Sequence, residues 1–186
     1  MRVIAGKFRS RPLRSVRGAP LRPTSDRLRE TLFNVIAAAV SIEGTVWLDL
    51  FAGTGAVGIE AISRGARQVY FVEESAEAAR LIRQNLALLE VEAGFEVLHR
   101  PVNVALRKLD AQGIRCDICF LDPPYSARKS YADCLEFLSQ SRILLPQSLV
   151  IAEHSRHFDP GERHATLLRY RKLEQGDGVL SFYKRG

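Results

Sequence analysis

From residue 45 onward, the chain alternates between short apolar runs and segments whose apolar residues recur at helical spacing. Apolar runs of this length predict buried strands, and apolar residues three or four positions apart predict amphipathic helices. The expected strands cover residues 45–50, 68–73, 95–100, 116–122 and 149–153, and the expected helices cover residues 56–63, 75–89, 104–109 and 131–140. Strands that alternate with helices indicate an α/β fold with an open, mostly parallel, doubly wound sheet.

The two ends of the chain add further elements. The helix-start signal Thr24-Ser25-Asp26 precedes an amphipathic segment that runs to about Val40. Near the C-terminus, Gly176-Asp177-Gly178 separates two strand-like runs and predicts a hairpin. We therefore expect a Rossmann-like sheet of seven strands, with an antiparallel strand inserted late.

Glycine-rich and polar residues follow the expected strands at their carboxyl ends. They are the glycine turn at 52–55, Glu73, the 101–103 region and Asp122. Ligands of doubly wound sheets bind beyond the carboxyl ends of the strands. The sequence therefore predicts a single site at this edge of the sheet.

The fourth expected strand ends in Asp122-Pro123-Pro124-Tyr125. Prolines have no N–H and hold the preceding residue extended, so this corner is rigid and leaves nearby carbonyl oxygens without ladder partners. The corner presents a carboxylate, carbonyl oxygens and an aromatic face. These groups suit a planar molecule with an exocyclic amine, because the oxygens accept the amine hydrogens and the ring stacks on Tyr125.

The first expected strand runs into Asp49-Leu-Phe-Ala-Gly-Thr-Gly55, whose glycines let the backbone approach a ligand closely. The spacing differs from the GxGxxG dinucleotide fingerprint, and the lysine of a phosphate-binding loop is absent. The Asp49 carboxylate would repel a pyrophosphate and attract an ammonium group. A nucleoside that carries an amino acid, such as S-adenosylmethionine, therefore fits this loop better than a dinucleotide.

Two further polar residues extend the expected cofactor site. Glu73 ends the second strand, where an acid can accept hydrogen bonds from both ribose hydroxyls. The adjacent Glu74 is the alternative, and the strand register favours Glu73. Asn103 lies just past the third strand and is a candidate for the adenine edge, with a capping or solvated role as the alternative.

Positive charge is concentrated at the N-terminus. The net charge is +6, and residues 1–30 contain nine Lys or Arg against two acids, Asp26 and Glu30. A segment of this kind is typical of a polyanion contact, most often nucleic acid. Apolar residues interspersed among the basic ones favour an ordered, hairpin-like extension over a solvated tail. We therefore expect a basic nucleic-acid-binding extension over residues 1–23, followed by the main domain over residues 24–186.

Bulk composition excludes several classes of protein. The 186 residues are 46% hydrophobic, which suits a globular chain with one full core. Apolar runs fall short of a membrane span, and the basic N-terminal residues lack the apolar segment of a signal peptide. Three cysteines argue against a disulfide framework and favour the cytoplasm. Cys116 and Cys119 lie inside an expected strand without a second pair, and the four histidines are scattered, so we expect no metal site.

Several of these motifs occur together in a known group of enzymes. Residues 49–55, Glu73 and residues 122–125, in this order, resemble class I S-adenosylmethionine-dependent methyltransferases of the branch that modifies exocyclic amines of bases. Two further segments, RVIAGKFRSR at 2–11 and LRPTSDRLRETLFN at 21–34, resemble the 16S ribosomal RNA guanine-N2 methyltransferase family (RsmD-like). The resemblance covers nearly the whole chain.

The resemblance implies methyl transfer from S-adenosylmethionine to the exocyclic N2 of a specific guanine in small-subunit (16S) ribosomal RNA, with S-adenosylhomocysteine as product. It implies that Asp122 and the Pro123 carbonyl accept the two amine hydrogens of a base flipped out of its helix. The RNA would be presented naked or as a 30S particle with ribosomal proteins. We expect a monomer that contacts no membrane.

The resemblance also sorts the candidate residues into three groups. The catalytic residues are Asp122, Pro123, Pro124 and Tyr125. The cofactor-binding residues are Asp49, Phe51, Ala52, Gly53, Thr54, Gly55, Glu73, Asn103 and Asp122. The RNA-binding residues are Arg2, Lys7, Arg9, Arg11, Arg22, Thr24 and Arg27.

Other functions remain open from the sequence alone. A DNA adenine-N6 methyltransferase is disfavoured because the chain has no obvious separate domain for reading DNA sequence. A nonenzymatic RNA-binding assembly factor is disfavoured by Asp49, Glu73 and Asp122, and a nicotinamide-dependent oxidoreductase by the glycine spacing. The choice of guanine over adenine rests on the resemblance. Glu153 and His154 are interpreted as a solvated strand end, with a border of the substrate pocket as the alternative.

Overall fold

The computed structural model describes residues 1–15, 25–124 and 126–186. Its helices are α1 (Asp26–Ala39), α2 (Ala56–Ser63), α3 (Ala76–Leu88), α4 (Val102–Ala111) and α5 (Arg128–Gln140). Its strands are β1 (Val46–Leu50), β2 (Gln68–Glu73), β3 (Phe95–His99), β4 (Cys116–Leu121), β5 (Leu144–Ser155), β6 (Arg163–His164), β7 (Leu167–Gln175) and β8 (Gly178–Arg185). Within these ranges, no helix has the length and apolar character needed to cross a membrane.

The described strands form one sheet in the order β3-β2-β1-β4-β5-β8-β7-β6. Strands β1 to β5 pair in parallel, and β8 lies antiparallel between β5 and β7. The predicted doubly wound fold with a late antiparallel strand is confirmed. The predicted number of seven strands was wrong, because the sheet has eight. The additional strand is β6, whose two residues are too few to show an alternating pattern in the sequence.

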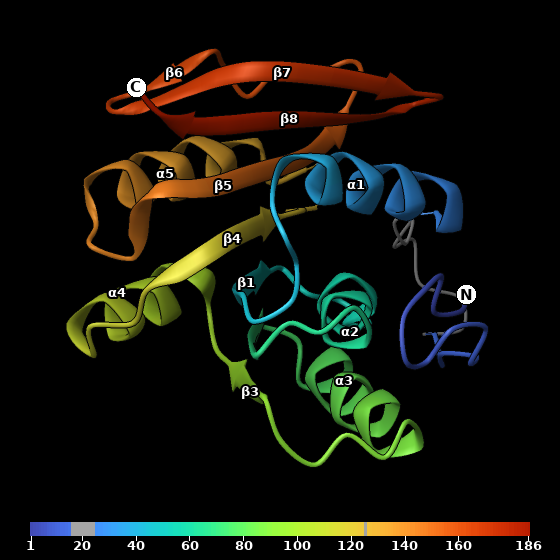
Figure 1. Ribbon diagram of the computed structural model, residues 1–186. Coiled ribbons are helices and arrows are strands. Elements are labelled where there is room, and N and C mark those ends of the chain that lie inside the picture. The colour runs from blue at the N-terminus through green and yellow to red at the C-terminus, as the bar shows by residue number, and fades with distance from the viewer. Residues whose placement is uncertain (16–24, 125) are drawn as a thin grey trace.

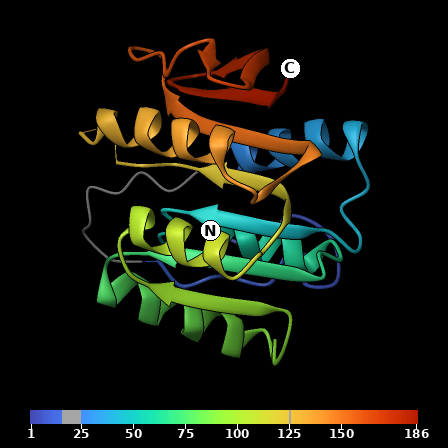
Figure 2. The ribbon, with the colours of Figure 1, turned by 90° about the vertical axis from the view of Figure 1, so that its left-hand side faces the viewer.

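Helices cover both faces of the sheet (Figures 1 and 2). On one face, a buried cluster joins α1, α2 and α3 to side chains such as Trp47 and Phe120. On the other face, a second cluster joins α4 and α5 to side chains such as Leu48 and Leu121. Neighbouring residues on β1 and β4 thus point to opposite faces, as the period of two in a strand requires.

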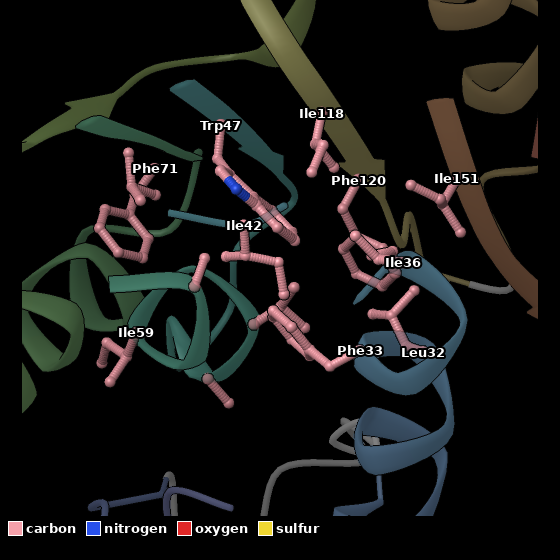
Figure 3. Packing of buried hydrophobic residues seen from close by; sticks show 14 of the residues in the cluster. Leu32, Phe33, Ile36, Ile42, Trp47, Ile59, Phe71, Ile118, Phe120 and Ile151 are labelled. Carbon is pink, nitrogen blue, oxygen red and sulfur yellow. The ribbon is translucent and has the colours of Figure 1, made fainter. Parts of the chain in front are cut away.

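Helix α1 packs across the centre of the sheet, over β1 and β4 (Figure 3). Phe33 stacks on Trp47 of β1 with ring centroids 5.2 Å apart. Leu32 and Ile36 lie beside Phe120 of β4, and each of these side chains is at most 2% exposed. Burying a side chain of this size stabilises a fold by about 2 kcal/mol. This packing holds together the two strands whose ends carry the glycine-rich loop and the Asp122 corner.

The described part of the N-terminal extension, residues 1–15, is a hairpin-like segment docked beside α1, α2 and α3 (Figure 1). Arg2 and Pro12 form an antiparallel bridge. Val3, Phe8 and Leu13 are buried in the same cluster as α1. The basic side chains are exposed: Arg2, Lys7, Arg9, Arg11 and Arg14. The segment therefore has the ordered, hairpin-like form expected from its interspersed apolar residues.

Helix α2 provides partners for the backbone of this extension. The buried Glu60 carboxylate accepts hydrogen bonds from the Ile4 and Ala5 amides at 2.7 and 2.9 Å. Gly6 has φ +80° and lies so close to α2 that an added Cβ would be 1.9 Å from the Ser63 carbonyl oxygen. Only glycine fits at this position, because any side chain would push the extension off α2.

We predict that Gly6→Ala lowers the free energy of unfolding by roughly 2–3 kcal/mol. The substitution adds both left-handed backbone strain and a collision with Ser63. Gly113→Ala is the matched control, since Gly113 also has a left-handed φ (+72°) but open space around it. Chemical denaturation of both variants separates the two effects. Equal losses in both variants would show that the contact with α2 contributes nothing.

Candidate active site

Two acids hold the glycine-rich loop that follows β1. The Asp49 carboxylate accepts a hydrogen bond from the Gly58 amide at 2.9 Å, which fixes the first turn of α2. Glu73, the last residue of β2, accepts from the Gly53 amide at 2.8 Å with one oxygen and from the Ser75 amide at 2.8 Å with the other. Both carboxylates therefore act on the same loop, from two neighbouring parallel strands.

The loop itself has an unusual backbone. Phe51 has φ +62°, which is uncommon for a residue other than glycine, and Gly55 has φ +77° at the start of α2. The buried Asn85 side chain of α3 donates a hydrogen bond to the Thr54 carbonyl at 3.0 Å. The same side chain accepts from the Arg14 amide at 2.8 Å. Asn85 thus joins the loop to the basic extension, a link that sequence reasoning missed.

Burial dominates the electrostatics of Asp49, which is 1% exposed. Loss of hydration raises the pKa of Asp49 to about 8, the Gly58 hydrogen bond opposes this change, and the nearby Glu73 charge adds to it. A positive charge next to Asp49 would favour its ionised form. The loop is therefore electrostatically suited to a ligand with an ammonium group.

The corner after β4 lies beside this loop. β1 and β4 are paired in register up to Leu50 and Leu121, and the Asp122 amide points to the Leu50 carbonyl at 3.4 Å. Asp122 is half-buried, Pro123 is buried and Pro124 is exposed. Burial raises the pKa of Asp122 well above its ordinary value, and the Glu153 and Asp49 carboxylates raise it further. The aromatic ring predicted to stack on a base, Tyr125, lies outside the described residues.

Glu153 and His154 are buried within β5, so their interpretation as a solvated strand end was wrong. Strand β5 continues to Ser155 because β8 pairs with it there, with Glu153 opposite Leu180. Local sequence gives no sign of this, since the pairing strand lies far along the chain. The His154 ring contacts the Ser181 hydroxyl at 2.9 Å and belongs to the core, whereas Glu153 lies next to Asp122 across β4 and β5.

Tyr131 of α5 holds the ends of β4 and β5 together. Its buried hydroxyl donates to the Glu153 carbonyl at 2.8 Å and lies 3.4 Å from the Pro123 carbonyl. A hydroxyl has one hydrogen, and the shorter contact takes it, so the Pro123 oxygen retains capacity to accept. A small hollow of about 80 Å³ lies beside this contact and is lined by Arg128, Tyr131, Ser155, His157 and Phe158.

The remaining cofactor candidates lie at the same edge of the sheet. Asn103 is exposed in the first turn of α4, which begins two residues earlier than predicted, and its side-chain oxygen accepts from the Val104 amide at 2.8 Å. Glu74 is exposed, and its carbonyl contacts the His99 ring. Its neighbour Glu73 is the acid that contacts the loop.

The predicted RNA-binding residues lie on and beside the extension. Arg2, Arg9 and Arg27 line a surface hollow of about 400 Å³, together with the acids Asp26 and Glu30. Lys7 lies over the Phe8 ring, and Arg11 donates to the Leu88 carbonyl at 3.2 Å. Arg22 and Thr24 lie outside the described residues. Apart from Arg27, which lies on α1, the described candidates thus lie on one segment docked against α2 and α3.

Within the described ranges, no group of three metal-ligating side chains lies together. Cys116, Cys119 and Cys134 are free and buried. Burial raises the pKa of the Cys134 thiol to about 12, and the Asp133 charge adds to this effect. The cysteines are therefore inert core residues, and the chemistry of the site depends on carboxylates and backbone groups.

Comparison with known proteins shows the family to which the chain belongs. The model of the family described as Conserved hypothetical protein 95 matches residues 1–184. The Bacillus subtilis protein named putative rRNA methyltransferase YlbH is 35% identical over 187 residues, covering all of both chains. Ribosomal RNA small subunit methyltransferase D of Escherichia coli K12 is 36% identical over 154 residues, covering 82% of this chain and 74% of that protein. The solved structure of the putative methyltransferase yhhF from Escherichia coli has a TM-score of 0.84 at 30% identity, covering 100% and 97% of the two chains.

The chain belongs to this RsmD-like family of methyltransferases. The family match includes the basic extension as well as the loop after β1 and the corner after β4. The extension is therefore part of what RsmD-like methyltransferases share with this chain. Its docking through Asn85 and Glu60 joins it to the loop side of the sheet.

We predict that Asp49→Asn makes this RsmD-like protein more stable at high pH. The Asp49 pKa is about 8 in the folded protein and about 4 in an unfolded chain. A folded-state pKa above the unfolded value means that the carboxyl group favours folding below about pH 4, and that this contribution is lost as the pH rises to about 8. Asparagine does not titrate and keeps an oxygen for the Gly58 amide.

The melting temperature of Asp49→Asn should therefore exceed that of the wild type at pH 8 by at least about 2 °C, corresponding to about 1 kcal/mol for a domain of this size. The difference in melting temperature between the variant and the wild type should become smaller toward pH 5. Asp133→Asn, an exposed change on α5, controls for the loss of a surface charge. A variant that is less stable than the wild type at pH 8 would contradict the account.

Proposed function

We propose that the protein transfers a methyl group from S-adenosylmethionine to the exocyclic N2 of a specific guanine in small-subunit (16S) ribosomal RNA. The main support for this proposal is the position of two segments in the sheet. The Asp122-Pro123 corner, which suits an amine, lies directly beside the glycine-rich loop, because β1 and β4 are adjacent parallel strands. A methyl donor at the loop and an amine at the corner would therefore meet at one edge of the sheet.

The relatives support a ribosomal RNA substrate. The Escherichia coli and Haemophilus influenzae proteins named ribosomal RNA small subunit methyltransferase D are 36% and 33% identical to this chain. Each match covers 82% of the chain. The cytoplasmic location, the monomeric state and the involvement of a 30S particle stay predictions.

The residues around the loop fit S-adenosylmethionine. This cofactor supplies a reactive methyl group on a positively charged sulfur. Asp49 lies at the Gly58 amide beside the loop, where its carboxylate would attract an ammonium group. Glu73 is held toward the loop, which favours it over Glu74 as the acceptor for ribose hydroxyls. Asn103, in the first turn of α4 after β3, would contact the adenine edge.

The corner would orient the guanine amine. The N2 lone pair of guanine is delocalised into the ring, which makes the nitrogen a poor nucleophile. The Asp122 carboxylate and the Pro123 carbonyl accept its two hydrogens and direct the lone pair toward the donor side. As the new N–C bond forms, the nitrogen gains positive charge, and these acceptors bind it more tightly. The raised pKa of Asp122 suits this group to take the proton that N2 releases.

The basic extension would hold the RNA around the flipped base. The side chains of Arg2, Lys7, Arg9, Arg11 and Arg27 are exposed and would contact phosphates, so binding should weaken as salt rises. Pro124 is exposed at the corner, and Tyr125 follows it as the expected stacking surface. A base must leave its helix to reach a corner of this kind.

Nucleoside analysis tests the proposed function. The protein is incubated with S-adenosylmethionine carrying a labelled methyl group, and with deproteinised 16S RNA, assembled 30S particles or DNA. The nucleic acid is then digested to nucleosides. We expect N2-methylguanosine from one or both RNA substrates. N6-methyladenine as the labelled product, or no label in any substrate, would overturn the proposal.

We predict that Asp122→Ala lowers methyl transfer by at least about 1,000-fold, because it removes an acceptor that acts on the amine in the transition state. Cofactor binding, measured by calorimetry with S-adenosylhomocysteine, should stay near the wild-type value. Asp133→Ala, an exposed change on α5, is the control and should leave turnover unchanged. Retained turnover in Asp122→Ala would exclude the proposed role of the corner.

A further inference from the structure

Asp122 has a second carboxylate as its neighbour. In the parallel pairing of β4 with β5, Leu121 lies opposite Ala152. The next residues along the chain, Asp122 and Glu153, therefore lie side by side. Phe120 and Ile151, one pleat earlier, belong to the cluster on the α1 face. The side-chain period of two therefore places the Asp122 and Glu153 side chains on this same face.

Glu153 is also held rigidly. It is 4% exposed, and its backbone pairs with Leu180 of β8. Its carbonyl accepts the Tyr131 hydrogen bond that joins the ends of β4 and β5. These contacts fix the backbone from which the Glu153 carboxylate extends, next to the corner. A fixed backbone position of this kind is what a specificity site requires.

Guanine and adenine differ at the atom next to the amine. In guanine, N1 carries a hydrogen, so N1 and N2 present neighbouring donors along one edge. In adenine, N1 carries a lone pair and no hydrogen. A carboxylate accepts hydrogen bonds and, when ionised, donates none. A carboxylate that faces N1 therefore attracts guanine and repels adenine.

We propose that Glu153 selects guanine by accepting a hydrogen bond from N1–H while Asp122 and the Pro123 carbonyl hold N2. The proposal rests on the proposed function, since it assumes that guanine N2 is the methyl acceptor. It assigns the choice between guanine and adenine to a residue outside the Asp-Pro-Pro-Tyr motif. Glu153 acts as a specificity residue that touches the substrate base.

Asp49 is less suited to this role than Glu153. Asp49 lies opposite Phe120 in the pairing of β1 with β4, one pleat below the level of Asp122. Its carboxylate is committed to the Gly58 amide under the loop. Glu153 lies level with Asp122 and on the side away from the loop. The base would then lie over β4 and β5, and the cofactor over β1 and β2.

The test compares two bases that share the 2-amine. The target position in the RNA is filled with guanine or with 2-aminopurine, which keeps the exocyclic 2-amine but has a bare N1 lone pair. The RNA is ligated from synthetic fragments and, if the wild type requires it, reconstituted into 30S particles. The kcat/KM for methyl transfer is measured for both substrates with the wild type and with Glu153→Gln.

We expect the wild type to prefer guanine over 2-aminopurine by about 100-fold or more, because a lost hydrogen bond at a buried acceptor is costly. Glutamine presents both an acceptor and a donor, so it can bind either N1. Glu153→Gln should therefore lower the preference by at least about tenfold. The ratio of the two kcat/KM values on one enzyme preparation is independent of the fraction of folded protein. Comparing this ratio between Glu153→Gln and the wild type cancels the different intrinsic reactivity of the two amines.

Glu92→Gln is the matched control, since Glu92 is exposed between α3 and β3, at the amino ends of the strands. It should keep the wild-type ratio. An equal loss of kcat/KM for both bases in Glu153→Gln, or a wild type that does not distinguish them, would overturn the inference. Failure of the proposed function gives a different result, which is that the wild type makes no N2-methylguanosine even from the guanine RNA.

Discussion

The parallel pairing of β1 with β4 is the constraint on which the rest of the site depends. Parallel strands end on the same side of a sheet, so the loop after β1 and the corner after β4 become neighbours. The order of the strands reverses between these two, which opens the edge for a ligand. Helix α1 covers both strands on the face where the acids point, with Phe33 on Trp47 of β1 and Leu32 beside Phe120 of β4.

Acidic side chains at this edge of the sheet lower the stability of the fold. Asp49, Asp122 and Glu153 lie on three adjacent strands, and burial next to other carboxylates raises the pKa of Asp49 and Asp122. The Gly58 amide offsets part of this cost at Asp49. A structure that needed only a stable core would place apolar residues here. Buried acids beside a loop with a strained backbone are typical of functional sites, where function is favoured over stability.

The predictions from sequence succeeded where local chemistry determines the structure. Proline and glycine constrain the backbone on their own, so the Asp122 corner and the loop at Gly55 could be located from a few residues. The predictions that failed concern residues whose environment depends on partners far away in the sequence. Glu153 is buried by a strand 27 positions further along, and Asn85 looks like any polar helix residue until Arg14, 71 positions away, is placed beside it. Strand β6 is too short for any pattern.

The basic extension and the edge of the sheet form one unit. Asn85 contacts both Arg14 and the Thr54 carbonyl, so the segment that would bind RNA is physically tied to the loop that would bind the cofactor. We expect the guanine amine to meet the methyl donor at the ends of β1 and β4.

A crystal structure of the protein with S-adenosylhomocysteine and an RNA fragment carrying the target guanine would show this arrangement. We expect guanine N2 within hydrogen-bond distance of the Asp122 carboxylate and the Pro123 carbonyl, with the cofactor sulfur facing N2 from the loop side. A flipped base bound away from this corner, or a sulfur that faces another atom of the base, would contradict it.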